Sequence, residues 1–569
     1  MIHEWPAFDE LSNWDAPPPV EEEGLVAEWV AERAFVGRYV HARGLGWLMW
    51  DSRRWAQITA VTPQEHLRQF AIEMKCVAGV RVADLLETDE YQRLDDLWSR
   101  FLEAEGGADA SVEQIERLKQ RFYGLSEEGA RLRELDRVRD VWVAVEHLGS
   151  KLLKLGRLTA ILRFVAEIEG VFADGAEFDQ DREWLCCLNG VVDLCTGELL
   201  PHDPARKITK LAPTAYRPKY TDPLWTQALR AVAPDAIAWL QTFVGQAVTG
   251  YVGEQLLVSV GDGSNGKSLV MGALASALGD YHTTVHHKAL QANKGDHATE
   301  MMEWRGARLA VLEELPEGRH LHPNIFKQLV DSPSLKARAM RQDPLTFTLT
   351  HTLLINTNFL PQIAEPGHGA WRRLAALPWP HTFRPRGVAL GGPTDLRGDP
   401  TLKRRLASEP GAREAVLAWV VEGAVNWFAQ EGLPETPESV IALTTKWRND
   451  EDHVGRFIEE NLVIEEGCAV RITELFEGFR TFLGDAGKSA WSADLFARRL
   501  EASPALRAAG VQRKAIKHGT SWTVTTLGGV TVPASNKTVR AWVGLRWRRE
   551  NEPHLSVVHS PDEDRREVR

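Results

Sequence analysis

The stretch Gly261-Asp262-Gly263-Ser264-Asn265-Gly266-Lys267-Ser268 decides the fold of this chain, because it carries the complete pattern G-x-x-x-x-G-K-[ST]. The apolar run Leu256–Val260 precedes it and predicts a buried strand. After it, Val270, Leu274 and Leu278 recur at helical spacing. A strand, a glycine-rich turn and a helix in this order predict a phosphate loop in an α/β fold.

The residue types in this loop suit the binding of a nucleoside triphosphate. Glycines let backbone N–H groups surround the phosphates, and the amino terminus of the following helix adds positive potential. Lys267 is expected to reach the β and γ phosphates, and the Ser268 hydroxyl is expected to hold Mg²⁺. The alternative is a glycine-rich turn with a chance lysine, but the correct flanking elements argue against it. We therefore predict that residues 261–268 bind a nucleoside triphosphate together with Mg²⁺.

Length and composition predict a multidomain protein of the ordinary globular kind. The 569 residues fit about three or four domains. Hydrophobic residues make up 44% and charged residues 26%, which is typical of soluble proteins. No apolar run reaches membrane-spanning length and residues 1–5 do not begin a signal peptide, so we expect a cytoplasmic protein with no membrane partner. The cysteines Cys186, Cys187 and Cys195 lack the spacing of a zinc site, which favours buried thiols in a reducing compartment.

The formal net charge of −12 does not exclude nucleic acid as a partner. Whole-chain charge bears on solubility more than on any one surface, and a channel can be basic while the outside of the protein is acidic. Contacts to DNA are therefore expected from local clusters of lysine and arginine.

Two acidic residues end the next predicted strand. Residues 308–314 form an apolar run that finishes in Glu313 and Glu314, about 45 residues after the phosphate loop. In a nucleotide site, one carboxylate binds Mg²⁺ and a second orients the attacking water. We assign these roles to Glu313 and Glu314 respectively. A solvated strand end is the alternative.

Two further motifs carry an amide and a pair of arginines. A strand over residues 351–355 leads into Asn358, whose amide could position water and sense the γ-phosphate; a simple Asx turn is the alternative. Arg372 and Arg373 follow a loop rich in glycine and proline. An arginine from a neighbouring subunit would neutralise charge in the transition state, whereas a surface pair is the alternative.

The basic residues Lys336, Arg338 and Arg341 are candidates for DNA contact. Lys336 and Arg338 alternate with alanines, which predicts a strand or hairpin with one basic face. Such a face suits the phosphate backbone of DNA. A solvated charged face is the alternative.

The region before the phosphate loop contains three kinds of predicted secondary structure. Residues 44–55 predict an aromatic hairpin whose tryptophans either form core or stack bases. Residues 61–170 are mostly helical. Residues 188–194 and 196–202 predict a second hairpin, and residues 223–250 return to helix.

After a helix over residues 413–432, a linker over residues 434–445 is expected to lead into a separate C-terminal unit. Helices are predicted over 454–462, 472–483 and 493–500, and a hairpin from 511–519 and 521–524 follows. Three helices and a basic hairpin form a winged-helix pattern, which binds DNA or contacts proteins. Its candidate DNA-binding residues are Arg513, Lys514 and Lys517.

These motifs together resemble the superfamily 3 helicases, specifically the poxvirus-type primase-helicases of phages and plasmids, over roughly residues 140–525. The most specific marks are Asn265, the compact order of the three later motifs, and residues 369–374. The resemblance implies a P-loop AAA+-like core and a homohexameric ring that moves three-prime to five-prime on single-stranded DNA. It implies that Asn358 is the sensor, that Arg373 is the better match to the arginine finger with Arg372 second, and that residues 336–341 are the DNA hairpin.

The expected organisation has five parts. They are a helical and aromatic region at 1–139, a domain preceding the helicase at 140–222, the ATPase at 223–432, a winged helix at 446–530 and a tail at 531–569. Residues 1–139 show no clear D-x-D metal pair with a matching histidine, so primase activity is not expected there and a separate primase is a candidate partner.

The function expected is that of an ATP-dependent replicative helicase of a phage, prophage or plasmid, acting on single-stranded and forked DNA in bacterial cytoplasm. One alternative is a DNA-binding ATPase for origin loading or packaging that does not unwind. Another is a winged-helix regulator with a degenerate ATPase.

Overall fold

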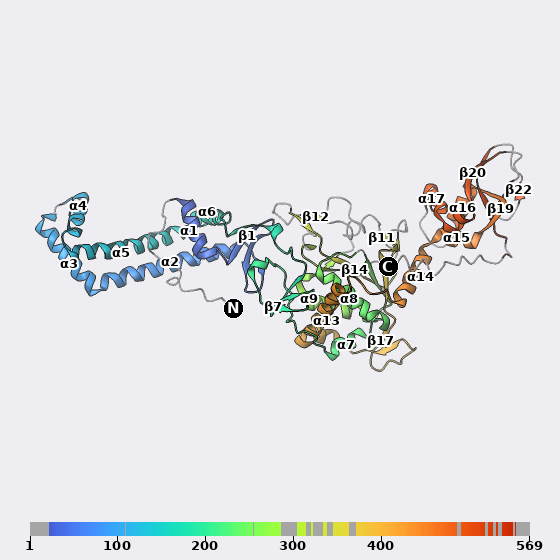
Figure 1. Ribbon diagram of the computed structural model, residues 1–569, viewed down its shortest axis with the longest axis horizontal. Coiled ribbons are helices and arrows are strands. Elements are labelled where there is room, and N and C mark those ends of the chain that lie inside the picture. The colour runs from blue at the N-terminus through green and yellow to red at the C-terminus, as the bar shows by residue number, and fades with distance from the viewer. Residues whose placement is uncertain are drawn as a thin grey trace.

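The computed structural model describes residues 22–107, 110–253, 255–285, 304–313, 320–321, 334–337, 345–363, 371–485, 491–517, 522–526, 531–532, 538–549 and 552. Figure 1 shows three parts in a row: a helical arm, a central α/β unit and a C-terminal unit at the opposite end. Among the described residues, no helix combines the length and apolar character needed to cross a membrane.

The first part begins with a small mixed layer. Helix α1 (Glu23–Val30) continues into a π-helical turn, and strands β1 (Tyr39–Arg43), β2 (Gly46–Trp50), β3 (Trp55–Gln57) and β4 (Phe172–Asp174) form a sheet in the order β3-β2-β1-β4. The aromatic hairpin predicted at 44–55 is present as β2 and β3. Trp47 and Trp55 are buried, as expected for core tryptophans rather than for stacking platforms.

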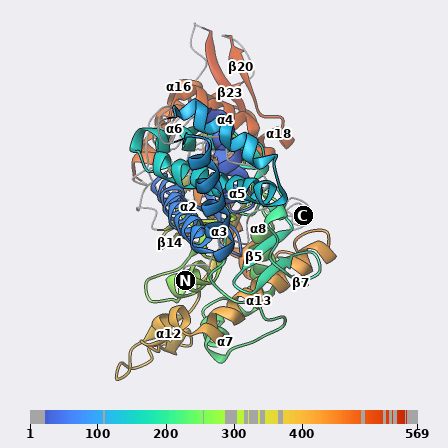
Figure 2. The same cartoon turned by 90° about the vertical axis from the view of Figure 1, so that its left-hand side faces the viewer.

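A long helical arm extends from this layer (Figure 1), and Figure 2 views the molecule from the end of that arm. It consists of the pair α2 (Val61–Glu87) and α5 (Glu127–Leu152), a tip formed by α3 (Asp89–Ala104) and α4 (Val112–Tyr123), and α6 (Leu155–Val165) at its base. Gly149 lets α2 and α5 approach closely, because a Cβ there would lie 2.8 Å from the Ala71 carbonyl oxygen. These helices confirm the prediction that residues 61–170 are mostly helical. Helix α5 runs without a break through the expected domain boundary at 139/140, because its buried stripe from Leu132 to Leu152 is continuous.

A second small sheet connects the arm to the central unit. Strands β5 (Trp184–Cys187), β6 (Gly190–Asp193) and β7 (Leu199–Leu200) form an antiparallel meander, so the predicted hairpin is present. Arg308 fastens this region to the central unit by donating to the main-chain oxygens of Val248 at 2.6 Å and Trp184 at 2.7 Å. A buried guanidinium satisfied by carbonyl oxygens fixes the two parts in one orientation.

The central unit is built on a parallel sheet of five strands in the order β16-β8-β14-β10-β9. The strands are β8 (Leu256–Val260), β9 (His282–Val285), β10 (Leu309–Glu313), β14 (Thr352–Thr357) and β16 (Leu374–Pro378). Their near-continuous apolar character is typical of strands that are buried on both faces. The mixed α/β class with a parallel sheet and a helical N-terminal region is confirmed.

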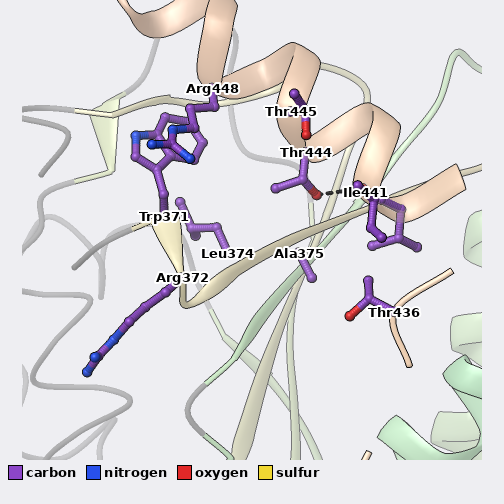
Figure 3. A pocket seen from close by; sticks show the side chains of 10 residues that line it. Trp371, Arg372, Leu374, Ala375, Thr436, Ile441, Thr444, Thr445 and Arg448 are labelled. Carbon is purple, nitrogen blue, oxygen red and sulfur yellow. Dashed lines mark hydrogen bonds between the residues drawn. The ribbon is translucent and has the colours of Figure 1, made fainter. Parts of the chain in front are cut away.

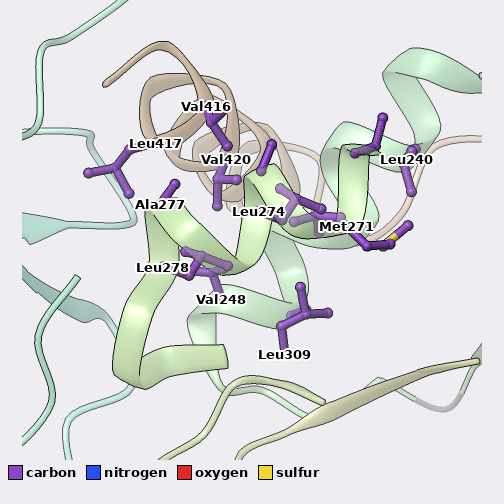
Figure 4. Close-up of a cluster of buried hydrophobic side chains, with 14 of the residues drawn as sticks. Leu240, Val248, Met271, Leu274, Ala277, Leu278, Leu309, Val416, Leu417 and Val420 are labelled. Atoms are coloured by element: carbon purple, nitrogen blue, oxygen red, sulfur yellow. The ribbon is translucent and has the colours of Figure 1, made fainter. Parts of the chain in front are cut away.

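Helices cover both faces of this sheet. One face packs against α7 (Pro223–Leu229), α8 (Ile237–Thr249), α9 (Lys267–Leu278), α12 (Leu402–Ser408) and α13 (Pro410–Ala429), and Figure 4 shows side chains of α8, α9 and α13 meeting there. The other face, which includes Val258, Leu312 and Ile355, packs against Trp304 and Trp447. Alternate residues along each strand therefore enter different cores.

The prediction of a linker over residues 434–445 is wrong from residue 438 onward. Helix α14 (Glu438–Glu451) begins there and packs against β16, with Val440 and Trp447 buried. The Thr444 hydroxyl accepts a hydrogen bond from the Ala376 N–H at 2.9 Å. The proline and threonine content suggested a linker, but the apolar side chains of this segment bury against the sheet and make it part of the central unit.

The C-terminal unit contains the three predicted helices as α15 (His453–Asn461), α16 (Ile472–Asp485) and α17 (Ala493–Ala502), followed by the short α18 (Pro504–Ala508). Its sheet has the order β20-β23-β19-β21-β22. The strands are β19 (Leu462–Arg471), β20 (Gln512–Ile516), β21 (Thr523–Thr525), β22 (Thr531–Val532) and β23 (Val539–Trp547).

Two expectations about this unit require correction. Strands β20 and β21 do not pair with each other, because β23 and β19 lie between them. Residues 539–547 are therefore a central strand and not part of a tail, and their Trp542, Leu545 and Trp547 side chains are buried against the helices. Burial of these three large apolar side chains explains why β20 pairs with the distant strand β23 and not with β21, which is nearer in the sequence.

Candidate functional site

Three of the predicted site segments meet at one edge of the central sheet. The phosphate loop follows the carboxyl end of β8, Glu313 ends β10, and Asn358 follows β14. Because these strands are parallel and β14 lies between β8 and β10, their carboxyl ends share that edge. Ligands of open α/β sheets bind in the crevice outside the carboxyl ends of the strands. This edge is called the nucleotide edge below.

The loop itself has backbone geometry that specific residues make possible. Gly266 has φ +88° and lies directly before α9, where a side chain would be strained. A Cβ on Gly261 would lie 2.3 Å from the Asn265 side-chain nitrogen, so the close turn requires glycine there as well. Ser264 also has positive φ, at 63°. Successive residues of this kind turn backbone N–H groups toward one concavity, which suits an anion.

A segment after β16 supports the loop, and the sequence did not predict it. The Trp379 N–H donates to the Val260 carbonyl oxygen at 2.9 Å, and its indole N–H donates to the buried Ser259 hydroxyl. The Phe383 N–H donates to the Ser264 carbonyl oxygen at 2.8 Å. No local pattern marks Trp379 or Phe383, because their role depends on β16 lying beside β8.

Lys267 is a buried cation of the site with two hydrogen-bond acceptors for its ammonium. Its ammonium donates to the Gly261 carbonyl oxygen and to Asn358 Oδ1, the latter at 3.0 Å. Burial lowers the pKa of Lys267 to about 8, and the nearby Asp262 carboxylate opposes this shift. Among the described residues, the hydrogen-bond partners of this ammonium are neutral oxygens, so it can still form a charge-assisted hydrogen bond to a phosphate group.

The remaining residues of the loop suit a triphosphate and a divalent metal. The Asn265 Nδ2 group is buried and has no hydrogen-bond partner among the residues that the structure describes, so it can serve as a further donor. Ser268 and Glu313 are exposed. Their hydroxyl and carboxylate groups are of the kind that bind Mg²⁺ together with the phosphates of a substrate. Glu313 stands opposite Asn356 in the sheet register. Glu314 lies outside the described residues.

Arg372 and Arg373 lie far from the phosphate loop of their own chain. They precede β16, whose Leu374 pairs with Leu256 and whose Pro378 pairs with Val260, so both arginines stand at the amino end of the sheet. Five strand residues separate the two edges, or roughly 16 Å. Arg372 is exposed and Arg373 is half-buried. This opposite side is called the arginine edge below.

The structure describes four of the six predicted DNA-binding residues, namely Lys336, Arg513, Lys514 and Lys517. Lys336 lies on β12 (Ser334–Ala337), which pairs antiparallel with β13 (Leu345–Thr348) and faces Thr346 in register, so the predicted strand pair is present. Arg338 and Arg341 lie outside the described residues. In the C-terminal unit, Arg513 and Lys514 are exposed on the edge strand β20, and the exposed Lys517 follows it.

Comparison with known proteins adds two family matches. Residues 27–234 match the family described as D5 N terminal like. Residues 259–373 match a family of unknown function (DUF5906). The first match covers the arm and the small sheets, and the second covers the phosphate loop through to the arginine pair.

Curated relatives come from large DNA viruses. The chain is 25% identical over 309 residues to "Putative primase C962R" of African swine fever virus (strain Badajoz 1971 Vero-adapted), covering 51% of this chain and 32% of that protein. It is 25% identical over 161 residues to "Putative helicase L207/L206" of Acanthamoeba polyphaga mimivirus, covering 27% and 17%. It is 21% identical over 259 residues to "Putative helicase 184R" of Invertebrate iridescent virus 6, covering 42% and 26%. The chain thus spans about a third or less of the length of these relatives.

Among solved structures, "The A form apo structure of NrS-1 C terminal region-CTR" covers 58% of this chain and 77% of its own. Its TM-score is 0.34 at 11% sequence identity. The sequence relatives and the D5 N terminal like match support the resemblance to viral and phage primase-helicases.

Proposed function

We propose, on the premise that this chain is a relative of the viral and phage primase-helicases, that it is an ATP-driven DNA helicase of a replication system. The supporting observation is the contact between Lys267 and Asn358 at the nucleotide edge, where Glu313 also ends its strand. Fold resemblance alone would not support an activity, because function depends on the site.

The proposed chemistry is hydrolysis of the terminal phosphate of ATP. Lys267 neutralises charge on the β and γ phosphates, and backbone N–H groups of residues 261–266 hold their oxygens. Ser268 and Glu313 are the residues that would hold Mg²⁺, which supplies further charge neutralisation when it is bound. Glu314 and Asn358 orient a water molecule, whose oxygen bonds to the γ-phosphorus while the bond to the bridging oxygen breaks and ADP leaves.

The proposal includes a second subunit. Arg373, with Arg372 as the second candidate, acts on the nucleotide of a neighbouring copy and stabilises the charge of the transferring group. The position of both arginines at the arginine edge supports this, since neither is near the phosphate loop of its own chain. A ring of about six copies, as the resemblance implies, gives every nucleotide such a neighbour.

Movement along DNA follows from the pore that such a ring creates. The β12–β13 strand pair, which carries Lys336, contacts the phosphate backbone of a single strand, and hydrolysis shifts it from one phosphate to the next. The winged-helix interpretation of the C-terminal unit, with Arg513, Lys514 and Lys517, provides a second DNA contact.

The test compares Glu314→Gln and wild-type protein in three assays: ATP binding, ATP hydrolysis and strand displacement on forked DNA. The variant should bind ATP but fail to hydrolyse it, because an amide cannot polarise water as a carboxylate does. Wild-type turnover in the variant would remove Glu314 from its role. Hydrolysis without strand displacement in the wild-type protein would instead favour a DNA-binding ATPase that loads or packages DNA.

A further inference from the structure

A groove lies beside the arginine pair, between helix α14 and the start of β16 (Figure 3). Its walls are largely apolar and include Trp371, Leu374, Val440 and Ile441, with threonine hydroxyls at the sides. Its enclosed volume is about 40 Å³, room for about three water molecules, so it can take the edge of an aromatic ring. Arg372 borders the groove and points away from the other lining residues (Figure 3).

An apolar side chain projects from the other end of the same sheet. Phe359 directly follows Asn358 at the nucleotide edge and is 50% exposed. Its backbone is held in a local turn, because its N–H donates to the Thr357 hydroxyl at 3.3 Å and its carbonyl oxygen accepts from that hydroxyl at 3.1 Å. Phenylalanine is among the residues enriched at the centres of protein interfaces, so a fixed and exposed phenylalanine is a candidate anchor.

The groove and Phe359 thus lie at opposite edges of one sheet. A contact that joins opposite edges of two copies is head to tail, and head-to-tail contacts that close produce a ring. We propose that Phe359 of one copy of this chain inserts into the groove of the next copy. This inference rests on the proposed function, because it uses the same arrangement that delivers an arginine to a neighbour's nucleotide.

Two features support a second copy as the occupant. Phe359 is adjacent to Asn358, which contacts Lys267, while the groove is adjacent to Arg372. When Phe359 of one copy contacts the groove of the next, the arginine edge of the second copy therefore lies near the phosphate loop of the first. The charges also match, since exposed Asp262 and Glu313 at the nucleotide edge would face the exposed Arg372 at the groove.

A paired-cysteine experiment tests the contact directly. Phe359→Cys and Ile441→Cys are made in separate full-length chains that also carry Cys76→Ser, because Cys76 is an exposed thiol. Mixing the two chains with a short thiol-specific crosslinker should give a covalent dimer that contains one of each. A chain with both substitutions should give a ladder of higher species. Equal crosslinking in either single variant alone, or none in the mixture, would overturn the proposal.

A second pair of variants separates this inference from the proposed function. Ile441→Glu should raise the concentration needed for half-assembly at least about tenfold, as removal of an interface anchor does. Ala442→Glu, on the exposed side of α14, is the matched control and should assemble normally. Ile441→Glu monomers should still bind a fluorescent ATP analogue. Normal assembly of Ile441→Glu overturns the groove contact even if ATP hydrolysis is found, whereas a crosslinked ring without hydrolysis overturns the helicase and keeps the contact.

Discussion

The Lys267 ammonium donates a hydrogen bond to Asn358 Oδ1 at 3.0 Å, although 91 residues separate them in the chain. The contact joins the end of strand β14 to the start of helix α9. In the absence of phosphate, the amide oxygen keeps a desolvated cation partnered. A bound γ-phosphate would compete for the same ammonium and leave the Asn358 amide able to orient water.

Substitution of either partner should separate binding from catalysis. Lys267→Ala should lower kcat for ATP at least about 100-fold, because a preorganised cation in a closed site cannot be replaced by water. Asn358→Ala should lower kcat with a smaller change in ATP affinity. Asn449→Ala, on the exposed surface of α14, is the amide control. Steady-state ATPase assays with a nucleotide-binding assay measure both, and unchanged kcat in Asn358→Ala would exclude the sensor role.

The lowered pKa of Lys267 predicts a pH dependence of ATP binding. Its value of about 8 in the ligand-free protein lies below the ordinary 10.5 because burial disfavours the charged form. Phosphate binding favours that form, so binding above pH 8 should take up a proton, and the Kd should rise by up to about tenfold per pH unit from there. Isothermal titration calorimetry in two buffers of different ionisation enthalpy measures the uptake. Lys267→Met should abolish it.

The same shift has a consequence for stability. Between pH 8 and pH 10.5 the unfolded chain keeps a proton on this lysine that the folded chain has lost. The contribution of Lys267 to the free energy of unfolding should therefore rise with pH in this window. Comparison of ligand-free wild-type protein with Lys267→Met by denaturant unfolding isolates this contribution.

Mixing of subunits should show that the arginine acts on a neighbour. Neither Lys267→Ala nor Arg373→Ala protein should hydrolyse ATP alone. In a one-to-one mixture, about a quarter of the interfaces combine an intact Lys267 with an intact Arg373, so activity should partly return. The control mixes Lys267→Ala with the double variant Lys267→Ala/Arg373→Ala and should stay inactive. Full activity in a strictly monomeric protein would contradict the model.

Loss of the basic hairpin residues should weaken DNA binding in a salt-dependent way. Lys336→Ala with Arg338→Ala should flatten the slope of log affinity against log salt on single-stranded DNA by about 0.7 for each lost phosphate contact. Unwinding should stop while DNA-free ATPase activity persists. Arg93→Ala with Arg117→Ala removes the same charge from exposed positions on the arm and should leave the slope unchanged. An unchanged slope in the hairpin variant would move the contact to Arg513, Lys514 and Lys517.

Truncation should reveal the role of strand β23. A chain that ends after residue 530 loses Trp542, Leu545 and Trp547, which are buried in the C-terminal core. Loss of each tryptophan costs about 3 to 5 kcal/mol and loss of the leucine about 2 to 5 kcal/mol, so the sum is comparable to the whole stability of a typical domain. Limited proteolysis should therefore digest residues 453–530 in this protein. A chain that ends after residue 552 should resist, and resistance of the shorter chain would show that β23 is dispensable.

Local patterns in the sequence predicted the elements with strong periodicity or turn chemistry. Strand β8, the glycine turn and helix α9 agree with prediction because their signals lie within about 20 neighbouring residues. The helices of the arm and of the C-terminal unit were also predicted. The linker at 434–445 and the tail at 531–569 were not predicted correctly, because their apolar residues have partners only in distant strands.

The sequence by itself determined the phosphate loop, its flanking elements and the residue types available for chemistry. Only the tertiary structure decided which of those residues meet. It places Asn358 against Lys267, Trp379 beneath the loop and the two arginines at the far end of the sheet. The physical reason is that strand order depends on which faces bury best together over long separations. A helix or turn depends mainly on its own neighbours, whereas the pairing of parallel strands depends on the whole core.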